Sequence, residues 1–268
     1  MTESYRGWRL LWGGSGPEGM DPRFVRRFIE LAGGAREARI AVVPTASEER
    51  ADTIARYRGA FELEGLQRLE ILDIRERAGA DEPATLRALG EATGVMLTGG
   101  DQLRLLDILG GTAFAAELRR RCRAGLLVGG SSAGSMALGD PVIVRGDPAE
   151  FYEPGAIRHQ PGLGLLEGVT VDTHFMVRGR LGRLVAMVSA FPDVIGLGID
   201  EDCGLLVSPD GVATVMGRAV VCVVDAQGAE PRPAVAEEGR GLSVSGLALH
   251  VLADGDRYDL RTRRARRD

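Results

Sequence analysis

Short apolar runs alternate with amphipathic stretches over the first 200 residues. The apolar runs are bounded by Gly, Pro or Asp, as buried parallel strands are, and lie at 10–12, 40–43, 69–72, 95–97, 126–128 and 194–199. Helical periodicity lies between them, at 24–31, 54–63, 103–109 and 181–188. This alternation predicts a single doubly wound α/β domain with a mostly parallel sheet.

The pattern changes after about residue 204. Runs rich in β-formers at 205–207, 212–216, 219–224 and 247–252 predict an antiparallel edge of the same sheet or a small appended sheet. The segment 139–168 is not periodic and holds four prolines, which predicts a long irregular loop that covers a site or builds an interface. We expect one α/β domain over 1–260 and a solvated basic tail over 261–268.

Composition and charge describe an ordinary globular protein. The chain is 44% apolar and 26% charged, with a formal net charge of -5, which excludes collagen, coiled coils and disorder. No run approaches the roughly 20 apolar residues of a membrane span, and the N-terminus has no signal-peptide core. Cys122, Cys203 and Cys222 are widely spaced, which argues against a disulfide framework or a zinc site. We therefore expect a cytoplasmic protein without a metal.

A glycine-rich motif at 14–19 follows the first predicted strand. It matches the dinucleotide fingerprint GxGxxG, which also requires an acidic residue at the end of the second strand. That strand instead ends in the sequence Pro-Thr-Ala-Ser at 44–47. We therefore interpret the motif as a tight turn from strand to helix rather than a nucleotide site.

A second small-residue motif, at 130–134, carries more chemistry. Its sequence Gly-Ser-Ser-Ala-Gly lies between a predicted strand at 125–129 and a predicted helix at 133–138. Such a turn strains the central serine and exposes its hydroxyl, so Ser132 is the candidate nucleophile. The N–H groups of Ala133 and of Gly100, at the end of the neighbouring strand, are the candidate oxyanion donors. The alternative is that the motif serves packing alone.

A serine nucleophile needs a base, and the chain has three histidines. His159 lies in the irregular segment and His250 in a terminal β-run, where structural roles are the default. His174 follows a short predicted strand at 169–171, and acids follow the next strand at 200–202. An α/β-hydrolase would instead place the acid, Asp200 or Asp225, before His250. The order serine, histidine, acid belongs to a different class.

Four motifs in register resemble the cyanophycinases, serine peptidases of the S51 group related to aspartyl dipeptidase. The resemblance runs from about residue 13 to about residue 207 and rests on these segments: Thr-Gly-Gly-Asp-Gln at 98–102, Gly-Ser-Ser-Ala-Gly at 130–134, Asp-Thr-His-Phe at 172–175 with Arg-Gly-Arg-Leu-Gly-Arg-Leu at 178–184, and Gly-Ile-Asp-Glu-Asp at 198–202.

The resemblance implies a flavodoxin-like, glutamine-amidotransferase-like sheet and a peptidase that cleaves cyanophycin, poly-aspartate with arginine on the β-carboxyls, into β-aspartyl-arginine dipeptides. It implies that Ser132 is the nucleophile, His174 the base and Glu201 the acid that orients it. The positions where the family holds its substrate are Gln102, Asp172, Arg178, Arg180 and Arg183.

The arginines suit such a substrate. Arg180 and Arg183 are three residues apart on a predicted helix face, so with Arg178 they could present planar donors to carboxylates. Asp172 could accept from a guanidinium. At 173, where the family generally has glutamine, this chain has the shorter Thr173, so we expect this position to affect substrate choice.

We expect a homodimeric serine hydrolase that forms an acyl-enzyme on an aspartyl peptide, without a cofactor, nucleic acid or membrane partner. One alternative is a related S51 peptidase that cleaves another α- or β-aspartyl peptide. Another is a catalytically silent binding module of the same architecture. Such a module is expected to have lost one member of the triad, and here all three residue types are present.

Overall fold

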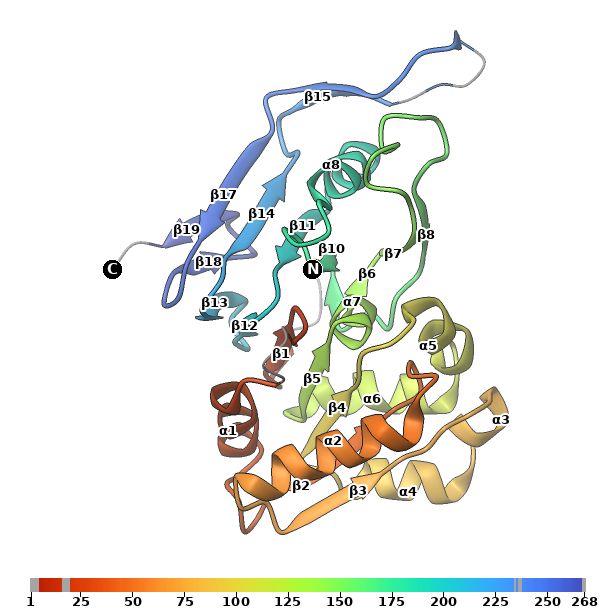
Figure 1. Cartoon of the computed structure of the whole chain (residues 1–268), viewed down its shortest axis with the longest axis vertical. Coiled ribbons are helices and arrows are strands. Elements are labelled where there is room, and N and C mark those ends of the chain that lie inside the picture. Colours follow the sequence, from red (N-terminus) through yellow and green to blue (C-terminus); the bar gives the residue numbers. More distant parts are fainter. Residues whose placement is uncertain (1–4, 16–19, 234, 236–237, 267–268) are drawn as a thin grey trace.

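The computed structural model describes residues 5–15, 20–233, 235 and 238–266 (Figure 1). It contains two large sheets, one of nine strands and one of six, together with two small two-stranded sheets. The predicted α/β class is confirmed. The size of the second sheet does not follow from the sequence, because short apolar runs do not show which neighbour each strand will pair with.

The nine-stranded sheet combines a parallel and an antiparallel half. The parallel half has the order β1 (Arg9–Trp12), β5 (Leu127–Ser131), β4 (Gly94–Leu97), β2 (Arg39–Val43) and β3 (Arg68–Ile71). The antiparallel half continues from β1 with β12 (Cys203–Val207), β13 (Val212–Gly217), β18 (Arg257–Asp259) and β19 (Arg264–Arg266). The antiparallel edge expected after residue 204 is therefore present.

Helices cover both faces of the parallel half. One hydrophobic cluster joins the sheet to α1 (Pro22–Leu31) and α2 (Arg50–Leu63), and Leu10 points into it. Leu11, the next residue, points into the other cluster, as alternation along a strand requires. That cluster also contains residues of α3 (Arg77–Ala80), α4 (Pro83–Glu91), α5 (Gln102–Leu109), α6 (Ala113–Ala124) and α7 (Ala133–Leu138).

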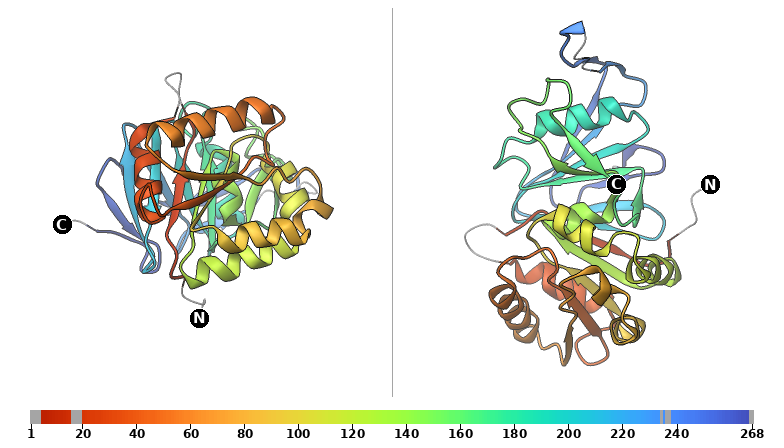
Figure 2. Two further views of the ribbon diagram at one scale, coloured as in Figure 1. Left: turned by 90° about the horizontal axis from the view of Figure 1, so that it is seen from below. Right: turned by 90° about the vertical axis from the view of Figure 1, so that its right-hand side faces the viewer.

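The six-stranded sheet lies beside the first. Its order is β17 (Ala248–Leu252), β14 (Val221–Asp225), β11 (Ile195–Ile199), β10 (Val169–Thr173), β6 (Gly139–Asp140) and β9 (Leu166–Glu167). The run at 194–199, expected to extend the main sheet, instead pairs parallel with β10 and antiparallel with β14. Figure 2 shows α8 (Leu181–Ala190) with this sheet at one end of the molecule, and α1 to α4 at the other.

The segment 139–168 is more regular than its sequence indicates. Besides β6 and β9 it holds a two-stranded sheet of β7 (Val142–Arg145) and β8 (Arg158–Gln160), whose register shifts between Ile143 and Arg145. Val142 and Ile143 are fully buried. The expectation of a wholly irregular loop is therefore wrong, because strands this short leave no detectable periodicity.

The basic C-terminal segment also differs from the expectation. Residues 264–266 form β19 at the sheet edge, and Arg263 binds the Asp225 carboxylate at 2.6 Å. Arg266 binds Asp259 at 2.5 Å. The expectation of a free tail is therefore wrong for 261–266, because Arg263 and Arg266 pair with acids of the domain and 264–266 form a strand, while 267–268 lie outside the described residues. Earlier in the chain, β15 (Glu230–Arg232) pairs with β16 (Ser243–Ser245).

Among the helices of the described residues, none combines the length and the apolar character that crossing a bilayer would require.

Candidate active site

Ser132 lies in a sharp turn between β5 and α7. Its φ of 50° and ψ of -116° are strained for a residue with a side chain. A Cβ on Gly130 would lie 2.4 Å from the Gly134 carbonyl carbon, and one on Gly134 would lie 2.2 Å from the Leu97 oxygen. The turn therefore requires glycine on both sides of the serine, as the motif predicts.

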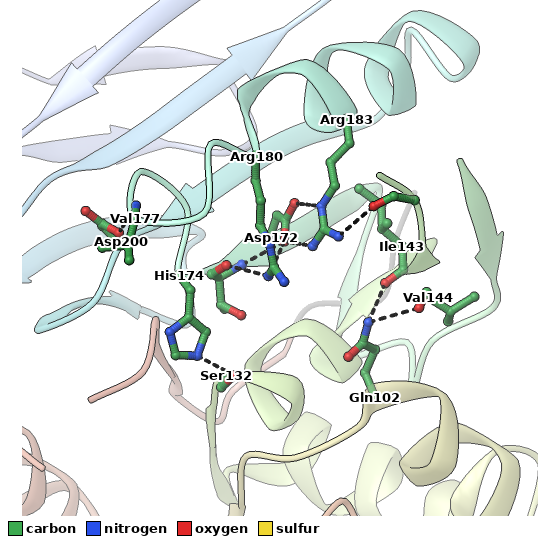
Figure 3. A network of polar contacts seen from close by, with 12 residues as sticks. Gln102, Ser132, Ile143, Val144, Asp172, His174, Val177, Arg180, Arg183 and Asp200 are labelled. Atoms are coloured by element: carbon green, nitrogen blue, oxygen red, sulfur yellow. Dashed lines mark hydrogen bonds and ion pairs between the residues drawn. The ribbon is translucent and has the colours of Figure 1, made fainter. Parts of the chain in front are cut away.

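Ser132, His174 and Glu201 form a continuous polar chain. The Ser132 Oγ lies 2.9 Å from His174 Nε2 (Figure 3). On the other side of the ring, His174 Nδ1 lies 2.6 Å from Glu201 Oε1. The contacts expected from the sequence are therefore present. His250 lies in β17 with its ring 5.2 Å from that of Tyr258, so the alternative order with His250 as the base gains no support.

Three consecutive carbonyls, at the last residue of β1 and the two residues after it, anchor the segments that carry these side chains. The Ser132 N–H donates to the Trp12 oxygen at 2.9 Å, the His174 N–H to Gly13 at 3.1 Å, and the Asp202 N–H to Gly14 at 3.0 Å. Ser132 follows a strand of the nine-stranded sheet, whereas His174 and Asp202 follow strands of the six-stranded sheet. The site therefore lies where the two sheets meet.

Gly14 has a role at the site that the sequence analysis missed. Its φ is 126°, and an added Cβ would lie 2.4 Å from His174 Cε1. Only glycine leaves room for the imidazole there. Of the GxGxxG motif, residues 16–19 lie outside the described residues. The available signal is the pair of glycines after the first strand, which the sequence pattern explains by a tight turn alone.

Ser135 is a second residue that the sequence analysis missed. It is fully buried, and its Oγ lies 2.8 Å from the Trp12 oxygen and 2.7 Å from the Gly130 oxygen. The Trp12 N–H also donates to this Oγ at 2.9 Å. Ser135 thus ties the start of α7 to β1, which supports the turn at Ser132.

The environment of His174 favours the neutral imidazole. Burial lowers the pKa of His174 below its ordinary value, the charge of Arg178 acts in the same direction, and the hydrogen bond to Glu201 opposes them. A histidine with a lowered pKa is unprotonated at neutral pH and can accept a proton. Its partner Glu201 is partly buried, with 22% of its side chain exposed.

Asp172 is enclosed by two arginines of its own chain. Its side chain is 0% exposed, and it accepts from Arg183 Nε at 2.5 Å, from Arg183 Nη2, and from Arg180 Nη1 at 3.1 Å (Figure 3). Arg180 Nη1 also donates to the Thr173 oxygen at 2.6 Å. The expectation that Asp172 accepts from a substrate guanidinium differs from this arrangement, because both carboxylate oxygens hold protein donors.

The cluster is nevertheless cationic. Two guanidiniums against one carboxylate leave a net charge of +1, and the exposed Arg178 adds to it. Burial is the main cause that lowers the pKa of Arg180 to about 10, so the side chain stays charged at neutral pH. Arg183 is 5% exposed, so it contributes charge but little accessible surface. The expected face shared by Arg180 and Arg183 exists, and it is directed at Asp172.

The Gln102 side chain is hydrogen-bonded within the protein, and the Thr173 side chain is buried. Gln102 Nε2 donates to the carbonyls of Ile143 at 3.1 Å and Val144 at 3.3 Å, which ties α5 to β7. Thr173 is 0% exposed, and its Oγ1 has no hydrogen-bond partner among the described residues. Neither side chain is thus presented to substrate in the way the sequence analysis expected.

A pocket of about 580 Å³ opens beside Ser132 and His174. Gly99, Gly100 and Arg178 also line it. Gly100 has a φ of 142°, and a Cβ there would lie 2.1 Å from the Ala46 oxygen, so this position in the pocket wall requires glycine. The convergence of the Gly100 and Ala133 N–H groups on a substrate oxygen stays a prediction.

The described residues contain no group of three His, Cys, Asp or Glu side chains that could hold a metal ion. The three cysteines are buried free thiols.

The chain is similar to known peptidases. A model of peptidase family S51 matches residues 10–215. A cyanophycinase of Trichormus variabilis is 39% identical over 256 residues, covering 94% of this chain and 85% of the relative. One from Synechococcus elongatus is 37% identical over 261 residues, covering 96% and 80%. One from Geminocystis herdmanii is 34% identical over 265 residues, covering 98% and 97%.

Two solved structures share the fold. A peptidase from an acI-B1 Actinobacterium matches with a TM-score of 0.70 at 20% identity, covering 96% of this chain and 98% of that one. A putative peptidase E from Listeria monocytogenes EGD-e matches with a TM-score of 0.56 at 17% identity, covering 80% and 99%. Since the family model spans most of the chain and the cyanophycinases align along nearly all of it, the chain belongs to peptidase family S51.

Proposed function

We propose that this protein is a serine peptidase that hydrolyses cyanophycin and releases β-aspartyl-arginine dipeptides. The observation that carries the proposal is the polar chain of Ser132, His174 and Glu201, with contacts of 2.9 and 2.6 Å. The similarity to proteins named cyanophycinase supports the choice of substrate.

In this mechanism His174 moves protons and Glu201 stabilises the charge that results. Ser132 Oγ attacks the scissile carbonyl carbon while its proton passes to His174 Nε2. Glu201 accepts from Nδ1 and stabilises the imidazolium. His174 then gives the proton to the leaving amine, which leaves an acyl group on Ser132. A water molecule, deprotonated by His174, attacks that ester and frees the enzyme.

The oxyanion of each tetrahedral intermediate is proposed to bind the N–H groups of Gly100 and Ala133. The left-handed φ of Gly100 and its place in the pocket wall support this role. Donors fixed before reaction are worth about 3–4 kcal/mol of barrier each. Replacing Gly100 by valine should therefore lower kcat more than it raises KM.

Substrate recognition is proposed to rest on the cationic cluster. Arg178 and Arg180 attract the carboxylates of an aspartate-rich chain, while Asp172 and Arg183 hold Arg180 in place. Gln102, through its two backbone acceptors, and Thr173, through its position in β10, shape the wall of the site.

The test is to incubate purified cyanophycin with the wild-type protein and with Ser132→Ala, and to follow dipeptide release by mass spectrometry. The wild type should release β-aspartyl-arginine. Ser132→Ala should be inactive and still bind the polymer, because only the covalent step is removed. The matched control is Ser245→Ala, a serine of β16 outside the site. Turnover by Ser132→Ala at the wild-type rate would refute the role of the serine.

A second candidate is a peptidase for another α- or β-aspartyl peptide. Thr173 favours it, because its short, enclosed side chain stands where the family generally has the longer glutamine. The same assay with α- and β-aspartyl dipeptides decides between the candidates. Cleavage of a dipeptide without cleavage of the polymer would favour the second.

We also propose that the enzyme acts in the cytoplasm as a homodimer, without a cofactor. The three unpaired, buried thiols suit a reducing compartment. Leu249 and Val251 of strand β17, at the sheet edge, are 52% and 60% exposed and offer an apolar contact surface. Sedimentation equilibrium tests the dimer, and a monomer at micromolar concentration would refute it.

A further inference from the structure

A second pocket lies at the opposite end of the strands that lead to the active site. It has a volume of about 520 Å³ and is lined by the first residues of three strands, Arg9 of β1, Val169 of β10 and Ile195 of β11. His174 and Glu201 follow the last residues of β10 and β11. The pocket is therefore separate from the proposed catalytic site, and a ligand bound in it would be independent of the proposed function.

Arg9 is a buried cation in the wall of this pocket. It is 5% exposed, and its Nη1 donates to the Gly7 carbonyl at 2.7 Å. Its Nε is buried and has no hydrogen-bond partner within the described residues. The guanidinium carbon lies 5.2 Å from the centre of the Tyr5 ring, a contact that favours a cation. Arg9 is thus held in place with part of its donor capacity unused.

In the described part of the chain, no ionised group compensates the charge of Arg9. Within the described residues it forms no ion pair with a carboxylate, and burial is the main cause that lowers its pKa. The two groups whose charge would oppose that shift are Cys122 and Tyr5. Burial raises the pKa of Cys122 to about 11 and raises that of Tyr5 as well, so both are neutral at pH 7. A buried cation without a counter-charge is destabilising, and an anion in the pocket would relieve that cost.

The other charged groups of the pocket leave room for such an anion. Arg261 is exposed and adds a second cation. Arg263 is already bound to Asp225. The acids of the lining, Glu167 and Asp193, are exposed residues, and Glu167 pairs with Arg123 at 3.4 Å.

We propose that this pocket binds a small oxyanion, a carboxylate or a phosphate, with the Arg9 guanidinium as the principal donor and Arg261 as the second cation. A guanidinium presents two parallel N–H groups at the spacing of carboxylate or phosphate oxygens. The volume admits a small organic acid as well as an inorganic ion.

The test is an NMR titration of the full-length protein with sodium phosphate and, separately, with sodium succinate, at an ionic strength held constant with sodium chloride. The amides of Gly168 and Gly211, both in the pocket wall, are the reporters. We expect their shifts to saturate with at least one of the two anions. In Arg9→Met, which keeps the apolar stem, the apparent Kd should rise at least about tenfold, as the loss of a charged hydrogen bond implies.

Two further variants keep the result decisive. Arg39→Met, an exposed arginine outside the pocket with 49% of its side chain exposed, is the control and should titrate as the wild type does. If Arg9→Met does not fold, Arg261→Met should weaken binding without disturbing the core. Saturation with only one anion would identify the ligand chemistry. Shifts that never saturate, that appear only around Ser132, or that are equal in wild type and Arg9→Met would overturn the proposal.

Discussion

Replacing Asp172 by asparagine removes the single carboxylate that two arginines share. Asp172 is 0% exposed, and the Arg183 side chain is 6% exposed. Removing one partner of a buried ion pair costs about 3–5 kcal/mol, because the other charge stays buried without compensation. Leaving Arg180 without its carboxylate adds less to this cost, since its side chain is 14% exposed and its Nη1 keeps the bond to the Thr173 oxygen. We expect Asp172→Asn to lower the free energy of unfolding by about 3–5 kcal/mol.

The assay is urea denaturation followed by circular dichroism, on Asp172→Asn, Arg183→Met and the double variant. The double variant removes both charges. Its loss in the free energy of unfolding should therefore be about 1–3 kcal/mol smaller than the sum of the losses in the two single variants. Asp73→Asn is the matched control. Asp73 is 25% exposed and pairs with two arginines that reach solvent, Arg75 at 67% and Arg50 at 25% exposure, so its loss should stay within about 1 kcal/mol.

Two outcomes would refute this reasoning. One is a loss in Asp172→Asn no larger than that in Asp73→Asn. The other is strict additivity of Asp172→Asn and Arg183→Met, which would mean that the two groups do not interact. Either result would leave Asp172 free to serve substrate directly, as the sequence alone suggested.

Three further predictions concern turnover. Gly14→Ala should lower kcat about 100-fold, because its Cβ must displace the His174 ring, and a small misplacement of a catalytic group costs that much; an unchanged kcat would contradict the contact. In Arg178→Gln, loss of a cation that lowers the pKa of His174 should move the acid limb of kcat/KM to higher pH, since His174 must be unprotonated to act. A neutral activated ester is the substrate for that measurement, and a limb that stays or moves to lower pH would count against it. Arg180→Ala should raise KM for aspartate-rich peptides about tenfold or more, and Arg180→Lys should restore only part of it because the fork of donors is lost; equal KM values in all three proteins would exclude carboxylate recognition.

The catalytic constellation could be predicted from sequence because strand ends and small-residue turns are local features. The motif around Ser132 requires glycine at fixed positions, and the structure shows the close contacts that explain this. His174 and the acids at 200–202 could be placed because they follow short apolar runs, and parallel strands end at the same edge of a sheet. The choice of Glu201 among those acids came from the resemblance to the cyanophycinases.

The features of the site and the fold that the sequence does not predict depend on contacts between segments far apart in the chain. The spacing of Arg180 and Arg183 predicts a shared face, but nothing in it shows that the face turns inward to Asp172. The apolar run that forms β11 has the pattern of any buried strand, so the sequence does not show which of the two sheets it joins. Gly14 illustrates the same limit, because its reason for being glycine is an imidazole 160 residues later in the sequence.

The three carbonyls of residues 12–14 act as a template for the active site. Each holds the backbone of a different segment, those of the serine, the histidine and the residue after the glutamate. Because these are main-chain bonds to adjacent residues, the spacing between the three segments follows from the covalent geometry of one short stretch of chain. The side chains around the pocket can therefore change without misaligning the reacting atoms. Inserting or deleting one residue in this stretch would displace all three segments at once.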